Sequence, residues 1–358
     1  MDKHIFAGNN TEKGFYNYFD HLITSWNLDK IYILKGGPGV GKSSFMKRLA
    51  KHFTRRGEYI EYIHCSNDHN SLDGIIIPNQ KMAMVDGTAP HIIEPKLPGL
   101  IEEILDFSKF LKEENLKKQK SKIRSLTREK TLSFQSGYYH LEIAGLISKI
   151  IDQIYYPFFD HDSKHLVESQ IISDLNQLLD SMAEHHKNDK KGKIRKAFSE
   201  AHTAGGYISY TKNLCKNKLV WSLVNPSINN TSLLLNNLVS ILTYYGYDIE
   251  SYYLPLHPDK LQHIYIKNLN LMIISSQEIP IVESEKVYSF LNCINQDQVD
   301  QDELKEYKKL YNLFLEKATN KFKEASQKHD LLEKIYIKNM DFNKVDNLYE
   351  EILSRYKD

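Results

Sequence analysis

The feature that most constrains the fold of this chain is an internal repeat. Residues 30–86 can be laid over residues 219–275 at a constant offset of 189, without a gap and with eleven identical positions. Upstream, the matches continue at an offset of 192 and pair Phe6, Thr11, Gly14, Tyr18 and Leu22 with Phe198, Thr203, Gly206, Tyr210 and Leu214. Two unrelated segments rarely keep register over such a span. The sequence therefore predicts two copies of one folding unit, which differ by three residues in one loop.

The first copy contains a glycine-rich loop. Residues 36–43, GGPGVGKS, fit the pattern G-x-x-x-x-G-K-[ST] at every fixed position. The apolar run 30–35 precedes the loop as a buried strand should, and apolar residues at helical spacing follow it as far as Gly57. This order predicts an α/β fold: a duplicated three-layer core of the P-loop NTPase type, with a helical hairpin after each copy (98–157 and 284–355).

Such a loop binds phosphate through its main chain. Its glycines let successive N–H groups point at phosphate oxygens, and the helix that follows adds its positive end. We expect Lys42 to reach the β- and γ-phosphates and the Ser43 hydroxyl to bind Mg²⁺. The predicted nucleotide-binding residues are Gly36, Gly37, Pro38, Gly39, Val40, Gly41, Lys42, Ser43 and Ser44.

A second magnesium ligand is expected at the end of an apolar strand. Residues 82–86 have this form, and Asp86 is the candidate, so Lys42 and Asp86 form the predicted catalytic pair. In the second copy, Thr231 stands in the place of the lysine and Ser275 in the place of the aspartate. This joint loss indicates that Lys42 and Asp86 belong to one site.

The second copy is predicted not to bind nucleotide. Its loop, residues 225–232, reads NPSINNTS and contains neither glycine nor lysine. Such a loop cannot easily adopt the phosphate-binding conformation, and the phosphate charge would be uncompensated. We expect this half to act as a scaffold, a lid or a partner surface.

The residue that would activate water is missing from its usual place. Many fast ATPases have a glutamate directly after the strand-end aspartate, whereas Gly87 follows here. Asp73, His91 and Glu94 are possible substitutes, and the sequence does not choose among them. Slow hydrolysis, or transfer to a bound substrate, fits this pattern better than rapid turnover.

Two further groups of residues are open to more than one interpretation. The polar loop 64–69 should lie at the mouth of the site; its His64, Cys65 and His69 match no standard zinc framework, so a metal site is the lesser alternative. Four arginines are possible γ-phosphate sensors or simply parts of solvated helix faces: Arg55, Arg56, Arg124 and Arg128.

Composition excludes several classes of protein. The 358 residues suffice for two domains, and a net charge of +1 gives no overall field that would attract nucleic acid. No stretch approaches the roughly 20 apolar residues of a membrane span, and the first residues lack the apolar core of a signal peptide. Three cysteines without paired spacing favour reduced thiols and a cytoplasmic location.

The repeat and the charge pattern predict the domain boundaries. We expect an active repeat with its hairpin at 1–160, a helix and linker at 161–194, and a degenerate repeat with its hairpin at 195–358. The best linker is the polar, basic run 184–196, which contains Gly192.

The motifs of the first copy resemble a poorly characterised bacterial family of tandem P-loop ATPases. The resemblance is carried by Phe6 with Thr11 and Gly14, by 34–43, by 64–66 with 71–74, and by 86–91 with Pro95, Pro98 and Gly99. It implies a cytoplasmic ATP-binding protein and supplies no substrate. The chain departs from the family in the glycine-free loop of its second half.

Three functions follow from these observations. The first is a Mg²⁺-dependent ATP-binding protein with slow ATPase activity in the first copy. The second is a kinase that acts on a nucleotide or small metabolite. The third is an ATP-switched binding module without significant turnover, with partner surfaces on the predicted helices 101–130 and 302–330. The acceptor, the partner, the base preference and the oligomeric state are not legible in the sequence.

Overall fold

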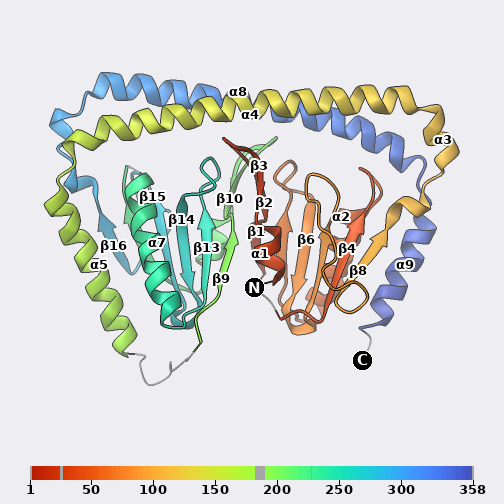
Figure 1. Cartoon of the computed structure of the whole chain (residues 1–358), viewed down its shortest axis with the longest axis horizontal. Helices are drawn as coiled ribbons and strands as arrows, with labels where there is room; N and C mark the ends of the chain where they lie inside the picture. The colour runs from red at the N-terminus through yellow and green to blue at the C-terminus, as the bar shows by residue number, and fades with distance from the viewer. Residues whose placement is uncertain (1, 25–26, 182–189, 227, 357–358) are drawn as a thin grey trace.

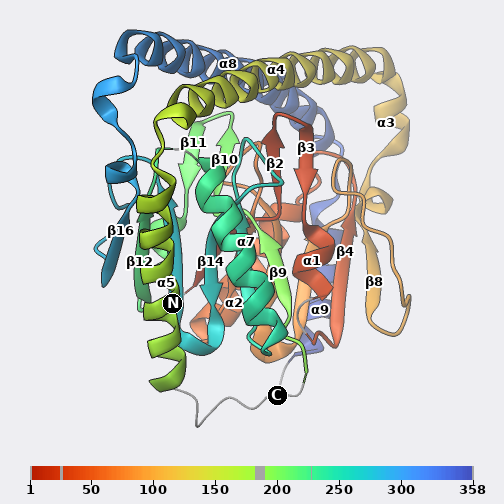
Figure 2. The same cartoon turned by 60° about the vertical axis from the view of Figure 1, so that its left-hand side comes forward.

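A computed structural model describes residues 2–24, 27–181, 190–226 and 228–356 of the chain. Two six-stranded mixed sheets stand side by side, and two long helices lie together across the strand ends of both sheets (Figures 1 and 2). In spatial order, the first sheet contains β1 (Lys3–Phe6), β5 (Glu61–His64), β6 (Leu72–Ile77), β7 (Met82–Asp86), β4 (Lys30–Lys35) and β8 (Glu102–Asp106). The second contains β16 (Lys286–Ser289), β12 (Leu219–Val224), β15 (Leu271–Ser276), β14 (Leu261–Ile266), β13 (Ile249–Tyr253) and β9 (Ile194–Ala197).

The two sheets have the same topology, which supports the internal repeat. Strand β4 lies between β7 and β8, and its counterpart β12 lies between β15 and β16, parallel to its neighbours in both cases. Each copy also has a two-stranded hairpin: β2 (Gly8–Thr11) with β3 (Gly14–Asn17), and β10 (Glu200–Thr203) with β11 (Gly206–Ser209). Lys81 and Asn270, which correspond at an offset of 189, both adopt the left-handed conformation.

The remaining elements are helices and 3-10 turns. The α-helices are α1 (Phe19–Thr24), α2 (Lys42–Arg55), α3 (Glu113–Lys118), α4 (Lys120–Tyr155), α5 (His161–Ser181), α6 (Thr211–Leu214), α7 (Ile228–Tyr244), α8 (Gln301–Ile337) and α9 (Phe342–Ser354). The 3-10 turns are η1 (Pro78–Gln80), η2 (Phe107–Phe110), η3 (Tyr156–Phe158), η5 (Lys267–Leu269), η6 (Leu291–Cys293) and η7 (Gln296–Gln298). Among the described helices, none combines the length and the apolar character needed to cross a bilayer.

The copies meet at the edge strands of their sheets. Phe6 and Phe198 exchange main-chain hydrogen bonds in both directions, each 2.9 Å long. Nearby, Asn9 donates from its side-chain amide to the carbonyl of Glu200, and Asn10 donates to the carbonyl of His202. Residues at matching places in the repeat thus face each other across an approximate two-fold axis.

A buried network of four charges lies at the same junction. Lys3 bonds Glu61 at 3.3 Å and Glu250 at 2.6 Å, and Arg195 pairs with the same two carboxylates. Burial opposes ionisation of Glu61 and Glu250, but the two cations outweigh it and lower the pKa of both carboxyls. Each cation comes from the edge strand of one copy and contacts carboxylates of both copies, so the network joins the two sheets.

The inward faces of both sheets share one apolar core. Buried side chains of β4 and β7 pack in the same cluster as buried side chains of β12 and β15. The short helices cross the junction: α1 contacts β9 of the second copy, and α6 contacts β1 of the first. The two halves therefore form one packed body.

The long helices do not form the hairpin that was predicted after each copy. Helix α4 of the first copy instead pairs along its length with α8 of the second (Figure 1). Leu141 and Ala144 of α4 share a core with Ala318 and Phe322 of α8. Because both helices carry apolar residues at three- and four-residue spacing, each can pair with a helix from either copy.

The terminal helices are exchanged between the copies. Helix α9 packs on the first sheet, where Val345, Tyr349 and Ile352 share a core with Phe45 and Leu49 of α2. Helix α5 correspondingly packs on the second sheet, where Ile171 and Leu175 join the core. Each sheet is therefore closed on its outer face by the helix that follows the other copy in the sequence.

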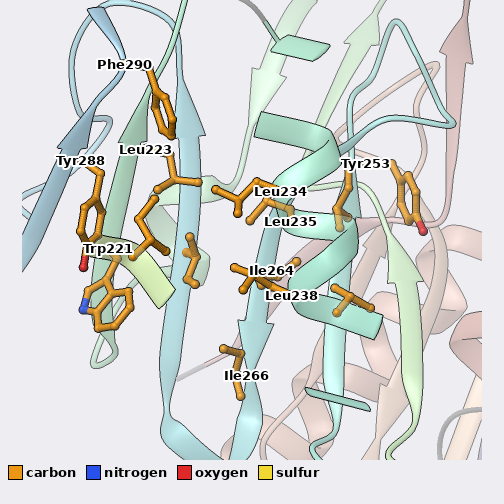
Figure 3. Packing of buried hydrophobic residues seen from close by; sticks show 14 of the residues in the cluster. Trp221, Leu223, Leu234, Leu235, Leu238, Tyr253, Ile264, Ile266, Tyr288 and Phe290 are labelled. Carbon is orange, nitrogen blue, oxygen red and sulfur yellow. The ribbon is translucent and has the colours of Figure 1, made fainter. Parts of the chain in front are cut away.

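The core of the second half shows how closely α7 packs on its sheet (Figure 3). The side chains at the centre of this core come from α7 and from the strands beneath it: Trp221, Leu223, Leu234, Leu235, Leu238, Ile264 and Ile266. Like α2 in the first half, α7 follows the central strand and covers the outer face of the sheet, which matches the strand and helix predicted from the repeat.

The prediction of helix is wrong for two short segments. Residues 102–106 form strand β8, and 286–289 form strand β16, at the free edge of each central strand. These short segments have only weak helical spacing. Pairing with β4 or β12 therefore decides their conformation, and they form strands. Residues 184–189 of the expected linker lie outside the described residues, and the boundaries at 160 and 195 stay a prediction.

Replacing Ile352 with Ala tests the exchange of helices. Ile352 is fully buried against the first sheet, so the substitution should destabilise the protein by about 2–5 kcal/mol. Urea unfolding measures this loss, and Leu331→Ala, at a position 42% exposed on α8, is the matched control. Equal effects of the two substitutions would show that α9 does not close the first core.

The buried charge network predicts loss of stability in acid. Because the folded pKa of Glu250 lies below its ordinary value of 4.5, its contribution is complete above about pH 4.5 and is lost as the pH falls. Glu250→Gln should be less stable at pH 7 but lose less stability between pH 5 and 3. Urea unfolding across this range measures the difference, with the exposed Glu283→Gln as control. Parallel pH profiles for wild type and Glu250→Gln would contradict the prediction.

Candidate functional site

The glycine-rich loop borders a cavity in the first half of the molecule. The cavity has a volume of about 760 Å³, within the range of small-molecule sites. All nine predicted binding residues, Gly36 to Ser44, line it, as does Asp86. Gly36, Gly39 and Gly41 have φ values of 151°, 71° and 96°, which other residues rarely adopt. The glycines predicted to shape the loop therefore stand at the positions that require them.

Lys42 and Asp86 come together in this cavity. The Lys42 Nζ lies 3.5 Å from the Asp86 carboxylate and donates to the carbonyls of Gly36, at 2.6 Å, and Gly37, at 3.0 Å. They approach because β4 and β7 are adjacent parallel strands, with Leu34 opposite Asp86 in register. The loop thus holds its lysine at the end of the strand that carries the aspartate.

Ser43 is oriented by the neighbouring strand. Its Oγ accepts a hydrogen bond from the Leu72 amide at 3.0 Å. The second copy keeps this contact, since Ser232 Oγ accepts from the Leu261 amide at 2.9 Å. This shared hydrogen bond explains why the serine survives in both copies when the lysine does not: it connects the helix to the neighbouring strand.

The lost ion pair of the second copy is replaced by two hydroxyls. Ser275 donates from Oγ to Thr231 Oγ1 at 3.1 Å, at the positions of Asp86 and Lys42. A smaller cavity of about 550 Å³ lies here, and the described residues that line it include Glu200 and Glu316 but neither Lys nor Arg. A triphosphate would meet carboxylates there without a compensating cation.

Two of the three candidate bases lie together at the first cavity. His91 Nε2 is 3.1 Å from Asp73 Oδ2, and both side chains are more than nine-tenths buried. Burial alone would lower the pKa of His91, but the adjacent Asp73 carboxylate outweighs it and raises the pKa. Glu94 instead lies away from the cavity lining, 69% exposed, and pairs with Lys35. Of the three candidate bases, Asp73 and His91 therefore lie at the cavity and Glu94 does not.

The loop after Asp86 is fixed by Lys35 and Thr88. Lys35 Nζ donates to the carbonyls of Gly87 and Ile93, both at 2.9 Å. Thr88 donates from its amide to Asp86 at 2.8 Å and from its hydroxyl to the Gly36 carbonyl at 3.0 Å. These bonds join the loop to the glycine-rich segment and orient the Asp86 carboxylate.

The basic side chains that line the cavity are not the four arginines that the sequence suggested as γ-phosphate sensors. Arg55, Arg56, Arg124 and Arg128 are not among the lining residues, whereas Lys47, Arg48 and Lys130 are. Lys47 and Arg48 lie one turn after Ser43 on α2, so helical spacing could have identified them. Lys130 belongs to α4, and only the tertiary structure brings it to the site.

Residues of the C-terminal half pack directly against the glycine-rich loop. A Cβ atom added at Gly37 would meet the Tyr336 ring at 2.9 Å, and one at Gly39 would meet the main chain of Glu333 at 2.8 Å. Phe342 of α9 lies beside Gly41. These residues lie nearly 300 positions from the loop in the sequence, so no local pattern marks them as its neighbours.

The zinc alternative for the loop 64–69 finds no support. His64 Nδ1 lies 2.7 Å from the His69 carbonyl, and its Nε2 lies 2.8 Å from His4 Nδ1. In the described part of the chain, no group of three or more His, Cys, Asp or Glu side chains is placed to hold a metal ion. Burial lowers the pKa of His64 to about 4, so the ring is neutral near pH 7.

Comparison with known proteins gives no match. No protein-family model, curated protein or solved structure is significantly similar to this chain.

Replacing Asp73 with Asn should lower the pKa of His91 below 6.5. The Asp73 carboxylate raises the pKa of His91, whereas burial lowers it. Without the carboxylate, the effect of burial would prevail. Titration of the imidazole by NMR with labelled histidine measures the shift. Glu94→Gln, in the same loop but exposed, is the control and should leave the His91 pKa unchanged. An unaltered His91 pKa in Asp73→Asn would contradict the proposed pair.

Proposed function

We propose that the first half binds Mg²⁺–ATP and hydrolyses it slowly. The single observation that carries this proposal is the Lys42–Asp86 pair, 3.5 Å apart in a cavity whose glycine-rich loop has three positive φ angles. Lys42 would hold the β- and γ-phosphates, and the main chain of residues 37–44 would donate to phosphate oxygens. The second half contributes no nucleotide site.

The residues present fit a magnesium ion. Mg²⁺ prefers oxygen ligands, and the Ser43 hydroxyl and the Asp86 carboxylate both line the cavity. Ser43 Oγ already accepts from the Leu72 amide, and a hydroxyl oxygen keeps a second lone pair for a metal. When bound, the ion would neutralise charge that develops on the phosphates.

Asp73 and His91 are the groups that we assign to proton transfer. Their pair lies in the same cavity as Lys42 and Asp86. Asp73 can accept a proton from an attacking hydroxyl or water, and His91 holds the carboxylate in place. The absence of a glutamate after Asp86 agrees with slow turnover.

A kinase that acts on a small metabolite is the second candidate. The observation that favours it is the cavity lining beyond the loop, where Asn10, Phe15, Phe134 and Tyr138 offer aromatic and polar surface for an acceptor. Such an enzyme would release little phosphate alone and would form ADP once the acceptor is added. The remaining alternative, an ATP-switched binding module, predicts binding with negligible turnover and a partner that is retained in one nucleotide state only.

Substitution of Lys42 tests the proposal. Lys42→Ala should weaken binding of Mg²⁺–ATP at least about tenfold, because the loop loses its cation, and should abolish phosphate release. Calorimetry and a phosphate-release assay measure the two effects. Lys51→Ala, on the exposed face of the same helix, is the control and should leave both unchanged. If Lys42→Ala and wild type bind equally well, or if wild type fails to bind at millimolar ATP, the proposal is wrong.

A further inference from the structure

The second half has a cavity at the place that corresponds to the candidate nucleotide site. Its volume is about 550 Å³, within the range of small-molecule sites. Matching positions of the repeat line both cavities, as three pairs illustrate: Phe15 and Tyr207, Lys42 and Thr231, and Asp73 and Gln262. The second copy therefore lacks the predicted phosphate-binding groups but keeps the space beside them.

The charged groups that line this cavity are acidic. The described residues of its lining include the carboxylates of Glu200 and Glu316 and neither Lys nor Arg. Burial lowers the pKa of His202 to about 4 and lowers that of His257, so both lining histidines are uncharged near pH 7. A phosphate or carboxylate group would find no charged partner in this lining, which favours a cation instead.

Glu200 provides a buried negative charge at this cavity. Its side chain is 4% exposed and accepts hydrogen bonds from Ser209 Oγ at 2.7 Å, from Gln262 Nε2 at 2.9 Å and from the Tyr207 hydroxyl. Burial opposes ionisation, but the neighbours of Glu200, these donors among them, outweigh it and lower its pKa. Neutral donors hold a carboxylate in place without neutralising its charge, so the charge attracts a cation into the adjoining space.

An organic cation suits this cavity better than a metal ion. Within the described ranges, no group of three or more His, Cys, Asp or Glu side chains is placed to hold a metal. Leu254, Pro255 and Ile281 give the lining apolar surface, which suits a methylene chain. The rings of Tyr207 and Tyr311 also line the cavity, and aromatic rings attract ammonium groups.

We propose that the cavity of the second half binds an aliphatic amine, with Glu200 as the buried partner of an ammonium group. Glu316 of α8 adds a second negative charge, and the apolar lining contacts the methylene chain. Because its described lining has no basic side chain, the cavity selects against amino acids and phosphorylated amines. This site goes beyond the proposed function and does not depend on nucleotide binding in the first half.

A neutral analogue and a charge reversal test this site. Putrescine is the probe, and the linear diol of the same chain length is its uncharged counterpart; calorimetry on the full chain should show at least about tenfold weaker binding of the diol. Glu316→Lys, at an exposed position, should weaken putrescine binding at least about fivefold, because it places a like charge in the lining. Glu324→Lys is the matched control, since it is exposed on the same helix and lines neither of these cavities.

The buried carboxylate has a test of its own. Glu200→Gln removes the charge and should weaken putrescine binding at least about tenfold, provided that thermal unfolding shows a folded protein. If this variant does not fold, Glu316→Lys and the diol decide. The inference is overturned if wild type does not bind putrescine at millimolar concentration, if the diol binds equally well, or if Glu316→Lys binds no more weakly than Glu324→Lys. The nucleotide site of the first half is judged separately, by Lys42→Ala.

Discussion

The packing of the last helix on the first sheet is the contact on which the rest of the structure depends. Without α9, the outer face of α2 and the core beneath it would be open, because Val345, Tyr349 and Ile352 fill it. The reciprocal position of α5 closes the second sheet in the same way. The exchange also carries α8 across the glycine-rich loop, so the same contact that completes the core builds one wall of the candidate site.

The charges at the junction make this arrangement specific. Lys3 and Arg195 each neutralise carboxylates from both copies, and loss of one partner would leave a buried charge uncompensated. Such a loss typically costs about 3–5 kcal/mol, whereas an intact pair contributes little net stability compared with apolar residues. The network therefore disfavours other ways of docking the two sheets more than it strengthens the observed one.

Local chemistry and self-similarity were sufficient to predict much of the fold and the centre of the candidate site. The strands 30–35 and 82–86 form as expected, and their parallel pairing brings Lys42 to Asp86. The helical hairpins were wrong because periodicity identifies an apolar face without identifying its partner. The same limit applies to Lys130 and Glu333, which line the cavity only because distant parts of the chain pack together.

The exchanged helices have a consequence for how the protein can be divided. Because each sheet is closed by a segment that follows the other copy, a cut at the seam between the repeats yields two fragments, each carrying a helix that belongs on its neighbour. Each fragment alone would leave the outer face of its own sheet open and would expose the apolar side of the helix that packs on the other sheet.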